Sequence, residues 1–428
     1  MLNGPTPAKP LSRAVVCGWE TARMDLRTFE GLLTERGQVL LAAVSGLDPA
    51  GEMAARLRGE YPAEWVLAAV EQVRLRRRAV AKFGVEAYRM YFTPDSLEHS
   101  SPQAVAAYRG VRILNEFGIV NAGAVGCGVG VDAVEMARAP MVTVVVDQDP
   151  LACAVTQANV RALGGIVAEF AWAQQCADLA AMAEEAVRYS ESVFISLAQR
   201  RGREGEVGAP EYWPPLEWAL DVVREVGEGA VKVPPDIAGE AIPDCSETEW
   251  ISYGGQVTEA VLWFGLSEHD ADRPDTPVPH GVRRATVLPG GASLTSRGLP
   301  APAVCPVGRY LYEPDDAVVR AGLLAEVAQD VGGGLIDETT TYLTADTLHA
   351  TAFATAYEIT DVLPYDVEKL QALLRERGIG ELSVKERGAA VVPDELSRLG
   401  TPPGPNTATV ILTRAARVPV MLLGHPIG

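Results

Sequence analysis

The sequence predicts an α/β protein whose central part is a parallel sheet with helices on both faces. Between Gly118 and Val233, short β-branched runs alternate with helical segments, which is the pattern of a doubly wound sheet. The run from 141 to 146 is β-branched or apolar throughout, as expected of a strand buried on both faces. At 428 residues the chain is long enough for two to three domains.

The region before this sheet is predicted to be helical. Apolar residues such as Phe29 and Leu32 recur at helical spacing from about residue 28 to residue 109, and Pro and Gly are sparse within these runs. The last helix, 102–116, leads into the sheet. We therefore expect a helical N-terminal domain over residues 1–105.

The central domain is expected over residues 106–295. It begins with a short apolar stretch, Ile119-Val120, and a glycine-rich turn at 123–130. Later, one strand follows another with Gly254-Gly255 as a hairpin turn, so antiparallel strands are expected to close the parallel sheet. The other elements are predicted as helices at 131–138, 151–163 and 218–226, and as strands at 141–146, 170–173, 193–195, 230–233, 250–253, 257–264 and 284–288.

A proline-rich stretch, 296–306, predicts a linker to a C-terminal α+β domain over residues 307–428. This domain is expected to open with one long helix, 314–331, that has Pro314 in its first turn. The elements predicted after it are a strand at 356–363, a helix at 366–377, a strand at 381–386, a short helix at 393–399, and strands at 408–413 and 418–423.

Composition narrows the classes of function. The net charge of −19 argues against binding a polyanion over the whole surface. A candidate for a local basic patch is formed by Arg74, Arg76, Arg77, Arg78 and Lys82. The alternative for that patch is a solvated helix face balanced by Glu71 and Glu86. No long apolar run predicts a membrane span, and the first residues do not resemble a signal peptide, so we expect a cytoplasmic protein. The six cysteines form no C-x-x-C pair, and no metal site is expected.

The strongest chemical signal is a glycine turn between a strand and a helix. Gly126, Cys127, Gly128 and Gly130 allow a tight turn and let a ligand approach the backbone, and Asp147 follows at the end of the next strand. A carboxylate there can accept hydrogen bonds from both ribose hydroxyls of a nucleoside cofactor. The alternative is a purely structural turn.

The spacing of the glycines in this turn distinguishes between two candidate cofactors, S-adenosylmethionine and NAD. The segment reads G-C-G-V-G-V-D, which favours S-adenosylmethionine, whereas the dinucleotide fingerprint is G-x-G-x-x-G. An NAD-dependent oxidoreductase would also need a His or Tyr to position the hydride, and none can be located. Asp149 is expected beside Asp147, and Asp178 is expected near the adenine.

The chain resembles bacterial class I S-adenosylmethionine-dependent methyltransferases that carry a C-terminal THUMP-like domain. The resemblance covers nearly the whole length and implies that fold, that cofactor and an RNA-linked role. Its landmarks, in chain order, are Lys82-Phe83-Gly84, Thr93-Pro94, Leu97-Glu98, Gly126-Cys127-Gly128, Trp213-Pro214-Pro215-Leu216, Val231-Lys232-Val233-Pro234-Pro235, Glu249-Trp250-Ile251-Ser252, Tyr310-Leu311-Tyr312-Glu313-Pro314-Asp315, Tyr342-Leu343-Thr344 and Lys385-Glu386-Arg387-Gly388.

Three positions depart from the family. Ala124 stands where an acid usually ends the first strand and helps to hold the methionine end of the cofactor. Ser196 and Leu197 replace the Asp-Pro pair that borders the transferred methyl group, and the third strand lacks its acid. By motif position alone, Ser196 and Gln199 occupy the catalytic place. Methyl transfer depends on aligning nucleophile, methyl carbon and sulfur, so these losses suggest weak activity, an altered substrate or binding without turnover.

Other side chains are candidates for substrate contact. Arg200 could bind a phosphate or the cofactor carboxylate, and Tyr212 and Trp213 could stack on a base. The alternatives are a loop arginine in water and a hydrophobic lid. Lys385 and Arg387 could face RNA, although their domain is rich in acids.

Two hypotheses follow from the sequence. The first is a methyltransferase that uses S-adenosylmethionine to modify RNA or a nucleotide-containing substrate. The second is a catalytically degenerate relative that binds cofactor, RNA or a protein partner.

Overall fold

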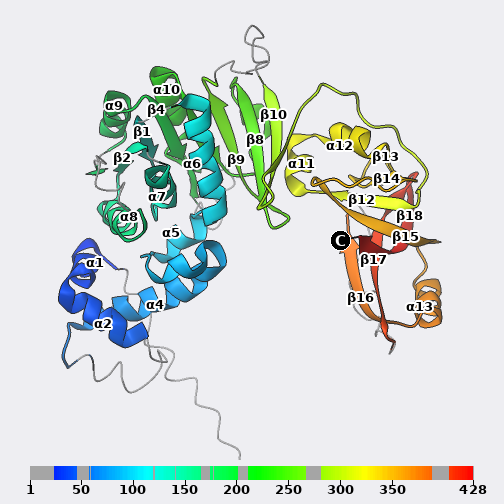
Figure 1. Ribbon diagram of the computed structural model, residues 1–428, viewed down its shortest axis with the longest axis horizontal. Helices are drawn as coiled ribbons and strands as arrows, with labels where there is room; N and C mark the ends of the chain where they lie inside the picture. The colour runs from blue at the N-terminus through cyan, green and yellow to red at the C-terminus, as the bar shows by residue number, and fades with distance from the viewer. Residues whose placement is uncertain are drawn as a thin grey trace, which may run out of the picture.

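The structure is a computed structural model that describes residues 24–45, 57, 59–118, 121–139, 141–164, 174–176, 178–200, 211–266, 281–387 and 404–427. It has two lobes, with the N-terminal helices and a large sheet in one and a smaller sheet in the other (Figure 1). Among these residues, no helix is both long enough and apolar enough to cross a membrane.

The N-terminal region is helical, as predicted. Asp25 accepts a hydrogen bond from the Thr28 amide and so begins the first helix. A capping box of Thr93 and Ser96, with Pro94 in the first turn, begins α5 (Pro94–His99), the short helix that precedes α6 (Gln103–Phe117). The helices are α1 (Leu26–Leu33), α2 (Glu35–Ser45), α4 (Ala63–Phe83), η2 (Gly84–Tyr88), α5 (Pro94–His99) and α6 (Gln103–Phe117).

The large sheet has the order β11-β10-β8-β9-β7-β4-β1-β2-β3. Strands β1, β2, β3, β4 and β7 run parallel to one another. Strand β9 lies between β7 and β8 and is antiparallel to both. The strands are β1 (Asn121–Val125), β2 (Val142–Asp147), β3 (Gln174–Cys176), β4 (Ser192–Ser196), β7 (Gly229–Val233), β8 (Glu247–Tyr253), β9 (Gln256–Phe264), β10 (Val282–Leu288) and β11 (Ala292–Thr295). The predicted hairpin is confirmed, with Gly254 and Gly255 both at positive φ in its turn.

Helices cover both faces of this sheet. On one face α6, α7 (Val131–Arg138) and α8 (Pro150–Leu163) pack through a cluster that includes Met136, Phe194 and Trp263. On the other face lie α9 (Leu179–Tyr189) and α10 (Leu216–Val226), which bury Met182 and Val223. The short strands β5 (Ala198–Arg200) and β6 (Glu211–Trp213) form a separate pair, and η4 (Gly239–Ala241) precedes β8. The predicted stretches 119–120 and 170–173 lie outside the described residues.

The smaller lobe has a sheet of order β13-β14-β12-β15-β18-β17-β16. The predicted strands and the helix at 366–377 are confirmed, and the helix predicted at 393–399 falls outside the described residues. The elements are β12 (Tyr310–Pro314), α11 (Asp316–Ala321), α12 (Leu324–Val331), β13 (Gly334–Leu335), β14 (Leu343–Ala345), β15 (Ala354–Pro364), α13 (Val367–Glu376), β16 (Ile379–Glu386), β17 (Asn406–Ala415) and β18 (Val418–Ile427).

The single helix predicted over 314–331 is wrong. Pro314 ends strand β12 and pairs in register with Ala354, so it is not in a first helical turn. Asp315 instead caps α11 through the Ala317 amide. Gly322, at φ 71°, then ends α11 in the left-handed region, and α12 begins anew two residues later.

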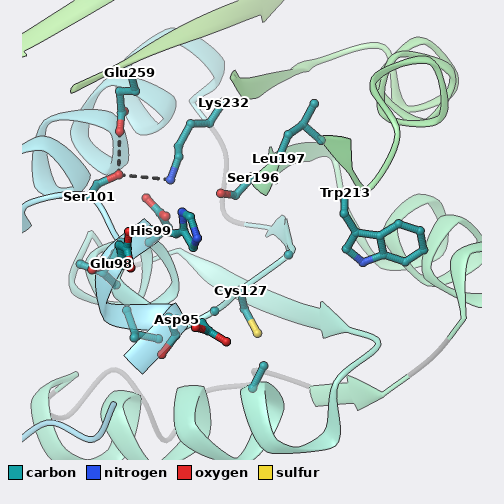
Figure 2. A pocket seen from close by; sticks show the side chains of 18 of the residues that line it. Asp95, Glu98, His99, Ser101, Cys127, Ser196, Leu197, Trp213, Lys232 and Glu259 are labelled. Atoms are coloured by element: carbon teal, nitrogen blue, oxygen red, sulfur yellow. Dashed lines mark hydrogen bonds between the residues drawn. The ribbon is translucent and has the colours of Figure 1, made fainter. Parts of the chain in front are cut away.

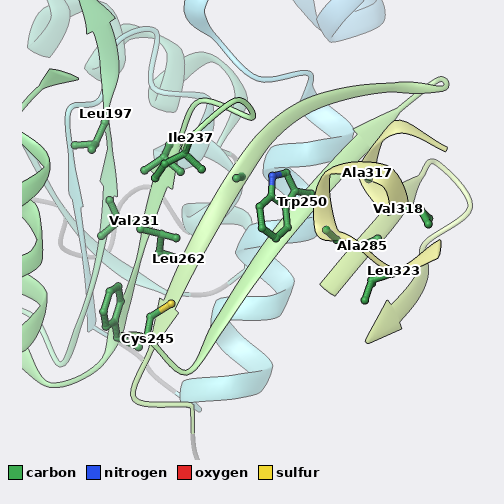
Figure 3. Close-up of a cluster of buried hydrophobic side chains, with 14 of the residues drawn as sticks. Leu197, Val231, Ile237, Cys245, Trp250, Leu262, Ala285, Ala317, Val318 and Leu323 are labelled. Carbon is green, nitrogen blue, oxygen red and sulfur yellow. The ribbon is translucent and has the colours of Figure 1, made fainter. Parts of the chain in front are cut away.

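Helix α11 packs against the outer strands of the large sheet. Ala317 and Val318 are fully buried in the same hydrophobic cluster as Trp250 and Leu262 (Figure 3). The helix that follows the first strand of the smaller lobe therefore completes the core of the larger one.

Candidate cofactor and substrate site

A cavity of about 860 Å³ opens at the carboxyl edge of the large sheet. This is the edge at which open α/β sheets bind ligands, and the volume suits a small-molecule cofactor with part of a substrate. The glycine turn, the ends of β2, β4 and β7, and the segment from α5 to the start of α6 all contribute side chains (Figure 2).

Each glycine of the turn has a different reason to lack a side chain. All three have positive φ: 74° at Gly126, 56° at Gly128 and 76° at Gly130. A Cβ on Gly126 would lie 2.5 Å from the Ser196 carbonyl oxygen, and one on Gly130 would lie 2.6 Å from Thr156. A Cβ on Gly128 would meet nothing within 4 Å, and Gly128 lines the cavity, so this backbone is open to a ligand.

Asp147 lines the cavity at the end of β2. One carboxylate oxygen accepts a hydrogen bond from the Cys127 amide at 2.9 Å, and the other accepts one from the Asp149 amide at 3.0 Å. These bonds fix the carboxylate beside the glycine turn, and the oxygen that accepts from the Asp149 amide keeps acceptor capacity for a ligand. Burial raises the pKa of Asp147. Asp149 also lines the cavity and caps α8 through the Leu151 amide.

The surroundings of Cys127 disfavour its thiolate form. A hydrogen bond with Cys153, burial and the negative charge of Asp147 together raise the pKa of the Cys127 thiol well above its ordinary value. Its side chain therefore stays protonated and contacts Asp147 at 3.4 Å.

The end of β4 supplies the predicted catalytic position. Ser196 and Leu197 line the cavity, together with Trp213 from β6. Gln199 and Arg200 lie in β5, where the Gln199 backbone pairs with that of Tyr212. The side chains of Gln199 and Arg200 are outside what the structure describes.

A buried polar cluster, not expected from the sequence, completes the site. Arg109, 1% exposed, forms ion pairs with Asp132 and Glu259. Burial opposes the charge of Arg109, but its two carboxylate partners outweigh burial and raise its pKa. The Ser101 hydroxyl donates to Glu259 at 2.6 Å, and the Lys232 ammonium donates to Ser101 at 3.3 Å (Figure 2).

Lys82 acts differently from Lys232. Its ammonium donates to the carbonyls of Leu97, Glu98 and Ser100, so it closes the C-terminal end of α5 beside the cavity. Lys82 and Lys232 both belong to segments that resemble the family, but only the fold shows that they line one cavity. The sequence held one sign that Lys232 has a special role, because a lysine is unusual within an apolar strand such as β7.

Several predicted residues lie elsewhere. Asp178 caps α9 through the Ala181 amide and does not line the cavity, nor do Gly130 and Tyr212. Lys385 and Arg387 belong to the smaller lobe, where they form ion pairs with Glu313 and Asp316. Lys385 and Arg387, the two side chains predicted to contact RNA, are therefore both paired with carboxylates of their own lobe.

The predicted basic patch on α4 is divided by the fold. Arg74 pairs with Glu71, as the solvated-face alternative expected, whereas Glu86 pairs with Arg138 instead. Arg76 turns inward over the ring of Tyr91. Among the described residues, no group of three or more His, Cys, Asp or Glu side chains could hold a metal ion.

Alanine at two glycines should separate folding from ligand access. We expect Gly126→Ala to lower the free energy of unfolding by about 1–3 kcal/mol, because its Cβ meets the Ser196 carbonyl. Gly128→Ala should keep the fold but weaken binding of S-adenosylhomocysteine roughly tenfold, because its methyl group enters the cavity. Urea denaturation and calorimetric titration measure the two effects.

Gly118→Ala is the matched control. Gly118 caps α6 at φ 61° with nothing within 4 Å of a Cβ, so it carries the same backbone strain away from the cavity. Equal ligand affinity of the Gly118 and Gly128 variants would contradict the assignment of the turn.

Comparisons with known proteins agree with this geometry. Residues 354–426 match a family model described as THUMP domain-like, and residues 25–79 match a domain of unknown function (DUF8688). The crystal structure of a proposed methyltransferase from Porphyromonas gingivalis W83 superimposes with a TM-score of 0.74 at 17% identity, covering 95% of this chain and 100% of that one. This chain therefore shares the fold of that proposed methyltransferase. The predicted fold class is thus confirmed.

Curated relatives point the same way. Two uncharacterised S-adenosylmethionine-dependent methyltransferases of Mycobacterium tuberculosis, from strains CDC 1551 and H37Rv, are each 29% identical over 353 residues, which is 81% of this chain and 92% of theirs. The predicted resemblance to methyltransferases with a C-terminal THUMP-like domain is therefore confirmed, and the predicted cofactor is the one in the relatives' names.

Proposed function

We propose that this protein binds S-adenosylmethionine and transfers its methyl group to RNA or to a nucleotide-containing substrate. The observation that carries the proposal is the pairing of an open glycine turn with a fixed carboxylate at one sheet edge. Gly128 leaves the backbone bare on the cavity side, and Asp147 is held beside it by the Cys127 amide. A nucleoside fits there with its ribose hydroxyls on Asp147.

The cofactor supplies an electrophilic methyl group, and the chain's task is to hold the acceptor in line with it. The end of β4 borders this position, where Ser196 offers a hydroxyl in place of a carboxylate. The THUMP-like match supports an RNA-linked substrate, because domains of that kind are generally associated with RNA modification.

A second candidate function is binding without turnover. The observation that favours it is the loss of charge at Ala124 and Ser196, positions at which the family has acids. Under this alternative the cavity still accepts the cofactor, and the protein acts as a binding partner.

Calorimetric titration of the full chain with S-adenosylmethionine and S-adenosylhomocysteine tests the first claim. We expect both to bind at one site per chain. Incubation with tritium-labelled cofactor and bulk RNA then separates the two candidates, because label in RNA supports the enzyme, and binding without label supports the degenerate relative. Absence of binding would remove both.

We also propose the division predicted from the sequence: a helical part over 1–105, a cofactor-binding part over 106–295, a linker over 296–306 and a THUMP-like part over 307–428. The separate matches at 25–79 and 354–426 support a distinct beginning and end. The first boundary falls in the first turn of α6, so this helix is shared between the two parts.

A further inference from the structure

Lys232 and Ser196 lie side by side where an acceptor is expected to meet the methyl group. They are register partners on the parallel strands β7 and β4, and the Leu197 amide donates to the Lys232 carbonyl at 3.0 Å. Partners in register point to the same face of a sheet, and both residues line the cavity. Lys232 thus stands next to the position at which related methyltransferases place Asp-Pro.

The ammonium of Lys232 has donor capacity left for a ligand. Within the described part of the chain it makes one side-chain hydrogen bond, to Ser101, and no ion pair. The Ser101 hydroxyl donates its hydrogen to Glu259. The Lys82 ammonium donates all three of its hydrogens to backbone carbonyls. An ammonium carries three donors, so two remain.

Lys232 also lies on the acceptor side of the cavity. Strand β7 is separated from β2 by β4 and β1, which amounts to three strand spacings of about 4.8 Å each. Because Asp147 at the end of β2 marks the ribose, the end of β7 lies beyond the cofactor's reacting sulfur. A group held by Lys232 is therefore expected to belong to the second ligand.

The donors at this place select a type of acceptor. An exocyclic amine, as in adenine or cytosine, needs hydrogen-bond acceptors such as the carboxylate of Asp-Pro. A cation and a hydroxyl suit the opposite group, a carbonyl oxygen, and suit it best when it carries negative charge.

We propose that Lys232 and Ser196 bind the carbonyl edge of a lactam nucleobase, uracil or guanine, and that the ring nitrogen beside that carbonyl receives the methyl group. This inference rests on the proposed function. The ring N–H first loses its proton to water, and Lys232 holds the resulting negative charge on the neighbouring oxygen. A nitrogen–carbon bond then forms as the methyl–sulfur bond breaks, and the electron pair of the broken bond stays on sulfur. The sulfonium cation of the cofactor and the anion of the base thus become two neutral groups, the thioether and the methylated base.

The test compares nucleotides that differ at this edge alone. Full-length protein saturated with S-adenosylhomocysteine is titrated with uridine and cytidine 5′-monophosphate, and then with the guanosine and 2-aminoadenosine pair of 5′-monophosphates. We expect the lactam member of each pair to bind roughly tenfold more tightly, the effect of one charge-assisted hydrogen bond. Lys232→Met should abolish this preference, and Lys232→Arg should restore most of it. Lys369→Met, at an exposed lysine on α13, should change nothing.

Three outcomes would overturn the inference: equal or tighter binding of the amino bases, no binding of any of the four nucleotides, or a Lys232→Met variant that loses affinity for S-adenosylhomocysteine but not for methylthioadenosine. The last result would assign Lys232 to the amino-acid tail of the cofactor, which methylthioadenosine lacks. Failure of the unmodified protein to bind S-adenosylhomocysteine would instead refute the proposed function.

Discussion

Arg109→Leu is expected to lower the free energy of unfolding by about 3–5 kcal/mol, the usual cost of leaving a buried charge without its partner. Arg109 lies 1% exposed between Asp132 and Glu259, and its removal leaves two carboxylates that line the cavity without their partner. Urea denaturation followed by tryptophan fluorescence measures the change.

Arg74→Leu provides the control for this prediction. Arg74 pairs with Glu71 on the surface of α4, with its side chain 58% exposed, so its loss should cost no more than about 1 kcal/mol. The triple variant Arg109→Leu, Asp132→Asn, Glu259→Leu should recover most of the lost stability, because no unpaired charge remains. Equal destabilisation by the two single arginine variants would show that the buried cluster carries no special cost.

Asp147→Asn is expected to weaken S-adenosylhomocysteine binding roughly 10- to 100-fold at neutral pH. The amide oxygen can still accept the hydrogen bond from the Cys127 backbone, so the glycine turn should persist. The side-chain NH2 cannot accept the bond from the Asp149 amide, and a ribose bound there would lose a charged acceptor. Asp178→Asn makes the same chemical change at the cap of α9, away from the cavity, and should leave affinity unchanged.

The pH dependence of binding gives a second measure of the same carboxylate. Burial raises the pKa of Asp147, and only the ionised form is a charged acceptor. Affinity should therefore fall as the pH is lowered, beginning at a higher pH than an exposed aspartate would give, and the Asp147→Asn variant should lack this dependence. A parallel loss in the variant would place the titrating group elsewhere.

Local sequence was sufficient for the parts of the site that are contiguous in the chain. The glycine turn, its helix and Asp147 lie within about twenty residues, and short-range rules for turns and strand ends locate them. The sequence alone does not separate a ligand-binding role for Asp178 from a cap, because a carboxylate just before a helix is equally suited to capping it, and Asp178 does cap α9.

The polar cluster could not be predicted because its members are far apart in sequence. Ser101 and Glu259 are separated by 158 positions, and they meet only because β9 is inserted between β7 and β8. The prediction of one long helix over 314–331 was wrong for a different reason. Its apolar periodicity continues through Gly322, and only the backbone angle at that glycine shows the interruption.

The burial of α11 against β8 and β10 has a consequence for how the two lobes respond to stress. Ala317 and Val318 share a core with Trp250, so removing the chain from residue 307 onward would uncover apolar surface on the larger lobe. We therefore expect both lobes to melt together in a single calorimetric transition, and a shortened chain that ends before α11 to be prone to aggregation. We also expect the smaller lobe to keep a constant angle to the larger one, because the two share this core.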